Sequence, residues 1–391
     1  RRLRQYRGRM AGPGGAERAL ARNHFEPEKR NSMVKTKILV TGAAGLLGGH
    51  IVDALDAEYA ISGLDMRQGK ADIDWHVGQL GDTAVLEKAV AGQNAIIHVA
   101  AIPNIWSGGA EAIMQTNVQA TYKLFAAAEA AGVERIVFCS SDSAVGFTVR
   151  DGAMVPPDYI PIDIDHPLNP TEPYGLSKLI GEEIGRSFAQ RGKLSVVALR
   201  PMFIAYPEMH GELRARATSP ETYSGTPAGG PSSAGGGVCW NHVDPRDAAR
   251  AFCLALKLKD VTFERFFISA ASTLSPEPTL DRLRAYLGYV PKIRRPEVYE
   301  ANPFAPLFDL KHAEERVTCF KTFIDENKDE LTALQIIYNQ SYAQQRLTYA
   351  AIKELAQAMK DPPHHLLAAD VWQAYKRLNA ASVKGAPVDQ Q

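Results

Sequence analysis

The stretch 35–50, KTKILVTGAAGLLGGH, constrains the fold of this chain more than any other. Residues 38–40 form a short apolar run, as a buried parallel strand does, and a helical pattern follows the stretch. Between them, Gly42, Gly45 and Gly48 recur at every third position. Such glycines let the backbone pass close to a pyrophosphate, and the next helix N-terminus offers free N–H groups and a partial positive charge. The strand, glycine turn and helix start therefore predict a dinucleotide cradle rather than a turn without a ligand.

The composition indicates a globular chain without a strong electrostatic field. Its 391 residues can supply the core of two or more domains, and Lys plus Arg equals Asp plus Glu at 44 each. This balance does not attract nucleic acid or an acidic membrane, and no apolar run approaches the roughly 20 residues of a membrane helix. The four cysteines lack metal-ligand spacing, so we expect reduced thiols in a cytoplasmic protein: Cys139, Cys239, Cys253 and Cys319.

From position 33 the chain alternates strand and helix patterns. We expect further strands at 58–64, 74–77, 95–99 and 135–140, and one long alanine-rich helix over 110–131. Repeated β-α units of this kind predict an α/β fold, a Rossmann-like, doubly wound parallel sheet with helices on both faces.

Asp65 ends the second predicted strand, where a Rossmann unit places the carboxylate that binds the adenine ribose. A carboxylate there accepts hydrogen bonds from both ribose hydroxyls and repels a 2′-phosphate, which favours NAD over NADP. Arg67 is near enough to soften this preference, but a solvated turn residue is the simpler interpretation. After the fourth strand, Ala100 and Ala101 are small and leave room for a cofactor at the carboxyl edge of the sheet.

The residues suited to acid–base chemistry follow the fifth strand and begin the next helix. Ser140, Ser141 and Ser143 form a hydroxyl cluster, and YGLSK places Tyr174 and Lys178 four positions apart. Positions four apart share a helix face, so Lys178 stands beside Tyr174. A neighbouring ammonium favours the phenolate and lowers the phenol pKa from about 10, so the pair can act as a general acid and base. Ser141 can hold the substrate oxygen while Tyr174 moves the proton.

Residues 33 to about 317 resemble the extended short-chain dehydrogenase/reductase superfamily, and within it the NAD-dependent epimerase/dehydratase group. The resemblance implies NAD as cofactor and a small substrate lobe formed by about 204–238 and 273–308. It rests on matching pieces in the family's order: TGAAGLLG at 41–48, HVAA at 98–101, Asn117, CSSDS at 139–143, YGLSK at 174–178, LRP at 199–201 and HVDPRDAARA at 242–251.

This resemblance assigns chemical roles to particular residues. It implies a catalytic triad of Ser141, Tyr174 and Lys178, with Asn117 supporting a proton relay. In the family the stretch that begins at His242 is mainly structural, so a catalytic role for this histidine is not expected. Two acids follow it, and they are expected to stand at a helix N-terminus: Asp244 and Asp247.

The resemblance also implies the cofactor contacts. Gln79 and Leu80 match the pair that contacts adenine, although the family usually has Asp-Leu there, and Met202 lies where the family packs a residue near the nicotinamide. The complete predicted cofactor-binding set is Gly42, Ala44, Gly45, Leu46, Leu47, Gly48, Asp65, Gln79, Leu80, Val99, Ala100, Ala101, Asn117, Tyr174, Lys178 and Met202.

The residues around the catalytic serine limit the reaction. Dehydratases of this family share the motif Thr-Asp-Glu, whereas the matching residues of this chain are Ser141, Asp142 and Ser143. Because the Glu is missing, dehydration is disfavoured. An epimerase acting on a sugar nucleotide and a net dehydrogenase of a small sugar or uronic acid both remain open, since both use the same triad.

Two further expectations concern the substrate side and the assembly. A stretch dense in Ser, Gly, Pro and Thr at 219–237 predicts a mobile loop over the substrate. Arg214 and Arg216 precede it and can bind a diphosphate or a carboxylate, although surface arginines are an equal alternative. Relatives pair through the helices that match 118–131 and 176–190, so a homodimer is expected.

The two ends of the chain differ from its middle. Residues 1–32 are rich in Arg and Gly without an apolar period, so we expect a disordered extension with Met33 as the natural start. Residues 319–387 resemble the C-terminal helical region of the R subunit of type I restriction enzymes, which supports assembly with modification subunits. We therefore expect an all-α appendage over 318–391. No GxxxxGK[ST] loop or nuclease constellation accompanies it, so DNA cleavage is not expected.

The join near 317–320 has no linker composition, which indicates either a misassembled reading frame or a natural fusion that docks through its helices. A second class of function is therefore an NAD-loaded scaffold or docking protein. The intact set of Ser141, Tyr174 and Lys178 favours an enzyme, since a pure binding module does not need it.

Overall fold

The computed structural model describes residues 35–55, 59–147, 155–209, 241–275 and 278–316. The predictions for four parts of the chain lie outside these residues: the extension 1–32, the loop 219–237, the pair Arg214 and Arg216, and the appendage 318–391.

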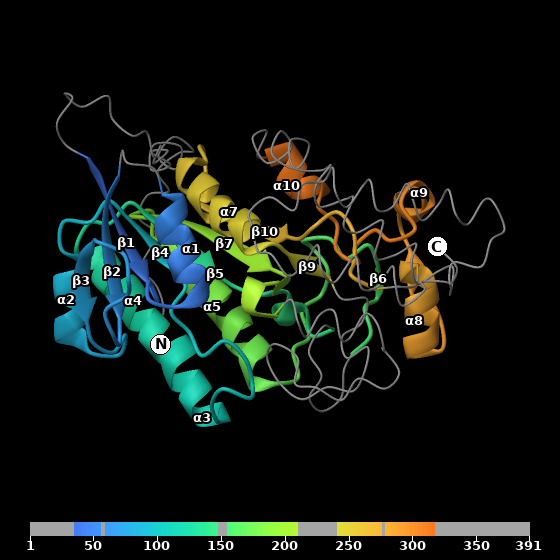
Figure 1. Cartoon of the computed structure of the whole chain (residues 1–391), viewed down its shortest axis with the longest axis horizontal. Helices are drawn as coiled ribbons and strands as arrows, with labels where there is room; N and C mark the ends of the chain where they lie inside the picture. Colours follow the sequence, from blue (N-terminus) through green and yellow to red (C-terminus); the bar gives the residue numbers. More distant parts are fainter. Residues whose placement is uncertain (1–34, 56–58, 148–154, 210–240, 276–277, 317–391) are drawn as a thin grey trace, which may run out of the picture.

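Seven parallel strands form the main sheet, which confirms the predicted Rossmann-like fold (Figure 1). Most of the expected strands are present almost residue for residue, because buried parallel strands need continuous apolar runs. In spatial order the strands are β10 (Phe263–Ile268), β7 (Ser195–Pro201), β5 (Arg135–Cys139), β4 (Ala95–His98), β1 (Thr36–Thr41), β2 (Tyr59–Asp65) and β3 (Asp74–Val77).

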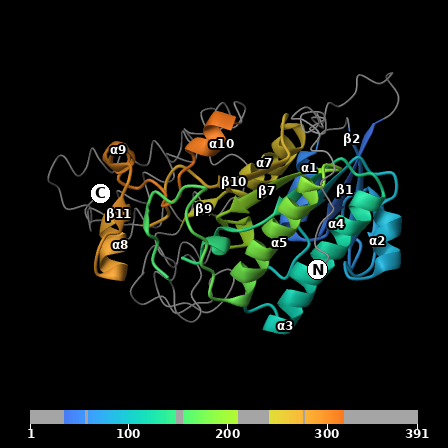
Figure 2. The ribbon, with the colours of Figure 1, turned by 180° about the vertical axis from the view of Figure 1, so that it is seen from behind.

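Helices cover both faces of this sheet. Ile38 and Val40 of β1 point into the hydrophobic cluster formed with α1 (Leu46–Ala54) and α7 (Pro245–Lys257). Leu39 between them points into the opposite cluster, because successive side chains of a strand face opposite ways. The views from front and back show the two helical layers, and the second consists of α2 (Thr83–Val90), α4 (Thr121–Ala130) and α5 (Pro173–Gln190) (Figures 1 and 2).

The order of the strands reverses at β1. This strand pairs with β2 on one side and with β4 on the other, so the chain crosses the sheet between β3 and β4. In open α/β sheets the crevice at the carboxyl ends of such a pair is where ligands bind. The topology thus places the glycine turn, which follows β1, at the switch point.

The expected single helix over 110–131 is not a regular α-helix, and this prediction is corrected. It consists of α3 (Ala110–Ile113), a wider π-helical segment η1 (Met114–Ala120) and α4, which ends at Ala130. π-helical turns are rare and frequently lie at functional sites. This segment contains Asn117, and the hydrogen bonds of that residue are described below with the candidate site.

A third hydrophobic cluster contains several residues from the range 273–308 that was predicted for the substrate lobe, and a substrate role for this region stays a prediction. Ile160, Leu283, Tyr299 and Phe308 are among its buried members. Its elements come from distant parts of the chain, namely β6 (Tyr159–Ile160), which pairs with β11 (Lys292–Ile293), together with α8 (Thr279–Leu287) and α9 (Pro296–Ala301). The cluster therefore also includes a segment near residue 160, which was not among the residues predicted for the lobe.

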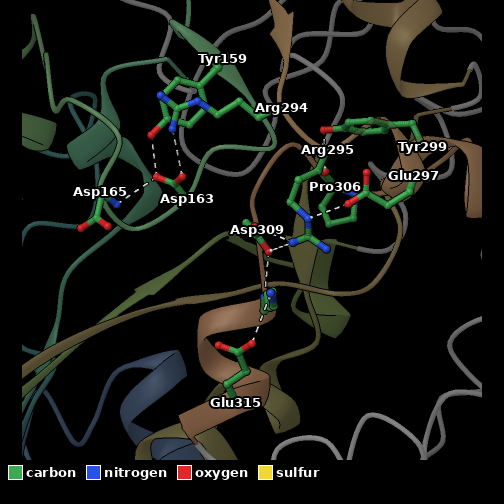
Figure 3. A network of polar contacts seen from close by, with 11 residues as sticks. Tyr159, Asp163, Asp165, Arg294, Arg295, Glu297, Tyr299, Pro306, Asp309 and Glu315 are labelled. Carbon is green, nitrogen blue, oxygen red and sulfur yellow. Dashed lines mark hydrogen bonds and ion pairs between the residues drawn. The ribbon is translucent and has the colours of Figure 1, made fainter.

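Two consecutive arginines that follow β11 bind two different segments of the chain (Figure 3). The Arg294 guanidinium lies 3.1 Å from the centroid of the Tyr159 ring and 3.4 Å from Asp163. Arg295 donates two hydrogen bonds, of 2.8 and 2.7 Å, to the carboxylate of Asp309. These contacts join β11 to the β6 segment and to the chain just before α10 (Lys311–Arg316).

Within the described ranges, no helix combines the length and the apolar composition needed to cross a bilayer.

Candidate functional site

The glycine turn packs so closely against neighbouring backbone that a side chain at Gly42 or Gly48 would not fit. Gly42 has φ +73°, and a Cβ there would lie 2.8 Å from the backbone nitrogen of Ala100. A Cβ on Gly48 would overlap the carbonyl oxygen of Gly42, so α1 packs directly against the turn. Gly45 is the N-cap of α1 and makes no side-chain capping hydrogen bond, and the first turn of α1 has no acidic residue. The first backbone N–H groups of α1 therefore have no capping side chain. This geometry fits a pyrophosphate.

Asp65 and Arg67 both reach the glycine turn from the end of β2. Asp65 accepts the N–H of Ala44 on Oδ2 at 3.0 Å and the N–H of Met66 on Oδ1 at 2.7 Å. The exposed Arg67 is not simply solvated, since its Nη2 donates to the Ala44 carbonyl at 3.2 Å. The predicted ribose carboxylate therefore lies beside the predicted phosphate cradle.

The other predicted cofactor residues sit at the same edge of the sheet or in the lobe. Leu80 is buried against α2, while Gln79 is exposed and its carbonyl accepts the N–H of Asp82. Met202 is buried in the cluster of the lobe, and its N–H donates to Ile268. Their contacts with adenine and nicotinamide remain predictions.

His98 is a positioning residue that the sequence reasoning missed. Its Nδ1 lies 2.7 Å from the hydroxyl of Thr41, and its Nε2 lies 3.0 Å from the hydroxyl of Thr121. Burial, with a smaller contribution from the charge of Lys178, lowers the pKa of His98 to about 3, so the ring is neutral. Thr41 in turn accepts the N–H of Ala100, which ties the ends of β1 and β4 together. A histidine within an otherwise apolar strand was the available signal.

Ser141 and Tyr174 meet at the end of β5. The Tyr174 side chain is hydrogen-bonded to the Ser141 side chain. Ser141 begins the short turn η2 (Asp142–Val145), where its Oγ accepts the N–H of Ser143 at 3.1 Å. The predicted hydroxyl cluster and the predicted helix thus come together through side-chain contact.

The start of α5 explains why Tyr174 lies there. Glu172 caps the helix and accepts the N–H groups of Tyr174, at 2.6 Å, and of Gly175. A Cβ on Gly175 would overlap the carbonyl oxygen of Ser143, so only glycine lets α5 approach η2 this closely. Neither Glu172 nor Gly175 was identified from the sequence, because both act through a contact between distant segments.

Lys178 is buried one turn along α5, as the four-residue spacing predicts. Its Nζ donates to the carbonyl of Cys139 at 2.8 Å and lies 5.6 Å from the centroid of the Tyr174 ring. Burial lowers the pKa of Lys178, an effect opposed by the charge of Glu182. The predicted lowering of the Tyr174 pKa is not found. Burial raises this pKa instead, because desolvation of the phenolate is the largest effect, so the group is a neutral phenol.

Asn117 connects the strand-end loop to α5, the helix that carries Tyr174 and Lys178. Its amide exchanges two hydrogen bonds with the backbone of Ile102, at 2.8 and 3.0 Å, and donates a third to Ser177 at 3.1 Å. Ser177 donates to the carbonyl of Tyr174 at 2.7 Å. The buried amide therefore has hydrogen-bond partners, as expected. The Ser177 hydroxyl links this amide to the backbone carbonyl of Tyr174.

The surroundings of His242 are consistent with a structural rather than a catalytic role for this histidine. His242 is buried in β9 (His242–Val243), which pairs with β8 (Phe203–Ile204), and burial lowers its pKa to about 4. Asp244 caps α7 by accepting the N–H of Arg246 at 2.8 Å, as predicted, and Asp247 follows in the first turn. Among the described residues there is no cluster of side chains that could hold a metal ion.

Comparison with known proteins identifies two segments. Residues 38–268, more than half of the chain, match the model of the NAD-dependent epimerase/dehydratase family. Residues 314–389 match the model of the EcoEI R protein C-terminal region, as the resemblance predicted.

Individual relatives match parts of the chain. An L-arabinose 1-dehydrogenase (NAD(P)(+)) of Haloferax volcanii is 30% identical over 171 residues, which cover 42% of this chain and 65% of the relative. A putative UDP-glucose 4-epimerase of Methanocaldococcus jannaschii is 31% identical over 185 residues, covering 45% and 56%. The chain thus spans less than two thirds of either relative.

One solved structure reproduces the fold nearly from end to end. A short-chain dehydrogenase/reductase superfamily protein from Agrobacterium tumefaciens, with bound NAD, is 25% identical. The alignment covers 75% of this chain and 99% of that one, with a TM-score of 0.52.

Proposed function

Because the chain belongs to the NAD-dependent epimerase/dehydratase family, we propose that it is an NAD-dependent oxidoreductase or epimerase acting on a sugar nucleotide or a related hydroxyl substrate. The observation that carries this proposal is the hydrogen bond between the side chains of Tyr174 and Ser141, with Lys178 buried beside them. These groups follow β5 and therefore share the carboxyl edge of the sheet with the glycine turn.

In this proposal NAD lies on the glycine turn, with its pyrophosphate at the start of α1 and its adenine ribose at Asp65. The bound cofactor supplies the acceptor for a hydride from the substrate carbon. The remaining predicted contacts are those of Gln79 and Leu80 with adenine and of Met202 with the nicotinamide.

The proton chemistry belongs to the chain itself. For the oxidation of a substrate hydroxyl, Tyr174 must first release its own proton to solvent. The phenolate oxygen then accepts the substrate proton while the Ser141 hydroxyl holds the same substrate oxygen. The Lys178 ammonium stabilises the phenolate that this step requires. In the reverse direction the neutral phenol donates the proton, and burial favours this form. Asn117 holds the turn of α5 that carries Tyr174.

Two outcomes of this chemistry are kept open. An epimerase returns the hydride to the other face of the same carbon, whereas a net dehydrogenase of a small sugar or uronic acid releases NADH. The names of the two relatives above represent both outcomes. Dehydration is disfavoured because this chain has Ser143 at the position where the dehydratases of the family have Glu.

The proposed assembly rests on fewer observations. A homodimer through α4 and α5 is consistent with the exposed Tyr122 and Leu176 on these helices.

An alternative of another class, a scaffold or docking protein binding restriction-modification subunits, is supported by the match of 314–389. A cytoplasmic location is favoured by Cys139, a buried thiol outside any disulfide.

The test is a substrate panel with the full chain and NAD. UDP-glucose, UDP-galactose, L-arabinose and glucuronate are incubated separately, and NADH absorbance and product NMR are followed. NADH release identifies a dehydrogenase, and an isomerised sugar without it identifies an epimerase. Tyr174→Phe should abolish turnover with an unchanged circular dichroism spectrum, whereas Tyr289→Phe, at an exposed tyrosine, should not. Near-normal turnover by Tyr174→Phe would refute the assignment.

A further inference from the structure

The Ser141 hydroxyl is fully engaged by the chain itself. It donates its proton to Oδ1 of Asp142 at 3.0 Å. Its oxygen accepts the N–H of Ser143 at 3.1 Å and is hydrogen-bonded to the Tyr174 side chain. A serine hydroxyl has one proton and two lone pairs, so these three contacts use its whole bonding capacity, and the Tyr174 phenol is the donor in its contact. Ser141 can therefore hold a substrate oxygen only if one of the three contacts breaks.

The bond to Asp142 is the contact that must break. Ser141 has a single proton, so donating it to a substrate oxygen takes it away from the Asp142 carboxylate. The carboxylate itself stays at the site, because Asp142 is the first residue of η2 and the Ser143 N–H holds the start of this turn on Ser141. A carboxylate accepts hydrogen bonds at about four positions, so the half-buried Asp142 can accept a new donor in place of Ser141 whatever its other contacts are.

The distances suit a substrate with two neighbouring hydroxyls. Asp142 Oδ1 lies one hydrogen-bond length from Ser141 Oγ, and a substrate oxygen held by Ser141 lies one such length from the same Oγ. In a sugar the oxygens on two neighbouring carbons are again about this far apart when the hydroxyls are gauche. These four oxygens can therefore close a ring, in which the second hydroxyl of the substrate points its proton at the Asp142 carboxylate.

The charges near Tyr174 favour a hydrogen-bond donor over an anion at this place. Burial is the largest cause of the raised pKa of Tyr174, and the charges of Asp142 and Glu172 raise it further. The Lys178 ammonium, which would attract an anion, already donates to the carbonyl of Cys139. A carboxylate or phosphate beside the reacting carbon would meet like charge from Asp142, whereas a hydroxyl there would make a charge-assisted hydrogen bond.

We propose that Asp142 is a specificity-determining residue, whose carboxylate accepts a hydrogen bond from a second substrate hydroxyl on the carbon next to the one that is oxidised. The inference rests on the proposed function, because it requires a substrate hydroxyl between Ser141 and Tyr174. It narrows the substrate class to sugars with a free, uncharged vicinal diol at the reacting carbon. A sugar that lacks the second hydroxyl cannot replace the Ser141 proton that Asp142 loses, and is a poor substrate.

A cycle between this residue and the substrate hydroxyl tests the assignment with the full chain and NAD. Each sugar of the panel above is compared with its analogue without the hydroxyl next to the reacting carbon. These analogues are 2-deoxy-L-ribose for L-arabinose, 2-deoxyglucuronate for glucuronate, and the 3-deoxy forms of UDP-glucose and UDP-galactose. Asp142→Ala removes the acceptor, and Asp142→Asn keeps the shape without the charge. Asp165→Asn is the matched control, since it removes an exposed carboxylate.

We expect the unaltered chain to have a kcat/KM about tenfold or more lower for the analogue than for the parent sugar, the usual effect of losing a hydrogen bond to a charged group. Asp142→Ala should use the two sugars nearly equally, and Asp142→Asn should lie between. Asp165→Asn should discriminate as the unaltered chain does. Calorimetric titration with NAD should give the same affinity for all four proteins, because the cradle is not altered.

Two results would overturn the role of Asp142. One is an equal kcat/KM for parent and analogue in the unaltered chain. The other is a ratio of parent to analogue that stays the same in the Asp142 variants, since the second hydroxyl would then have a different partner. If Asp142→Ala does not fold, the ratio in Asp142→Asn decides alone. Turnover of no sugar by the unaltered chain is distinguishable from these results, because it overturns the proposed function and this role with it.

Discussion

Glu182 and Arg200 form an ion pair in which neither side chain has exposed surface. Two nitrogens of the guanidinium donate to the two carboxylate oxygens, at 2.7 and 2.6 Å, and Ser140 donates to the same carboxylate. Glu182 lies one turn beyond Lys178 on α5, while Ser140 and Arg200 belong to the ends of β5 and β7. The pair therefore fixes α5 against the ends of β5 and β7, next to the serine cluster.

Glu182→Gln should destabilise the protein strongly, because it leaves the buried charge of Arg200 uncompensated. Breaking a buried pair in this way costs about 3–5 kcal/mol of unfolding free energy. The neighbouring Glu183→Gln is the matched control, since Glu183 pairs with Arg186 on the surface with about half of each side chain exposed. Urea unfolding should show a large loss for the first variant and little change for the second. Equal effects would show that the buried pair does not fix α5.

Two adjacent glycines of α1 should respond to alanine in opposite ways. At Gly48 a Cβ would overlap the carbonyl of Gly42, so Gly48→Ala must displace the helix from the turn. We expect a loss of roughly 1–3 kcal/mol, as in other overpacked sites, and a loss of NAD binding. At Gly49 a Cβ would meet nothing within 4 Å, and alanine is the better helix former.

Gly49→Ala should therefore raise the unfolding free energy by about 0.5–1 kcal/mol and retain NAD binding. Thermal unfolding and calorimetry on both variants check the pair of predictions. A Gly48→Ala protein as stable as Gly49→Ala would contradict the close packing of the turn against α1.

The sequence was most informative where local pattern alone decides the structure. β1, β2, β4 and β5 follow from apolar runs, and the glycine turn follows from its spacing. Tyr174 and Lys178 share a helix face because helical periodicity requires it. Ser141 was placed with them by the resemblance to the family.

Contacts between distant segments could not be read from such patterns. β6 and β11 are two-residue strands whose partners lie more than a hundred positions apart, so neither has a period of its own. The π-helical turn contains Asn117, whose side-chain bonds to Ile102 and Ser177 join segments far apart in the sequence. The raised pKa of Tyr174 likewise depends on how deeply its hydroxyl is enclosed, which a four-residue spacing does not specify.

Asp65→Ala should weaken NAD binding, because it removes the acceptors proposed for the two ribose hydroxyls. The expected loss is about tenfold or more, the effect of removing charge-assisted hydrogen bonds. Asp72→Ala is the control, since it removes an exposed carboxylate from the same loop. Calorimetry with NAD should separate the two variants. An unchanged NAD affinity in Asp65→Ala would remove Asp65 from the cofactor site.

Asp247 should give the stability of the protein an unusual dependence on pH. Burial, and then the nearby charge of Asp244, raise the pKa of Asp247 from 3.8 to about 7. The folded state therefore holds this proton more tightly than the unfolded state does. Stability from the protonated carboxyl is fully present below about pH 4 and is lost as the pH rises through about 7.

Asp247→Asn has no proton to lose at this position, so its stability relative to the unaltered protein should improve between pH 4 and pH 8. Urea unfolding of both proteins across this range measures the difference. Asp53→Asn, which alters an exposed acid on α1, is the control and should give a constant difference. A constant difference for Asp247→Asn as well would mean that the carboxyl titrates normally, and that the first turn of α7 does not enclose it.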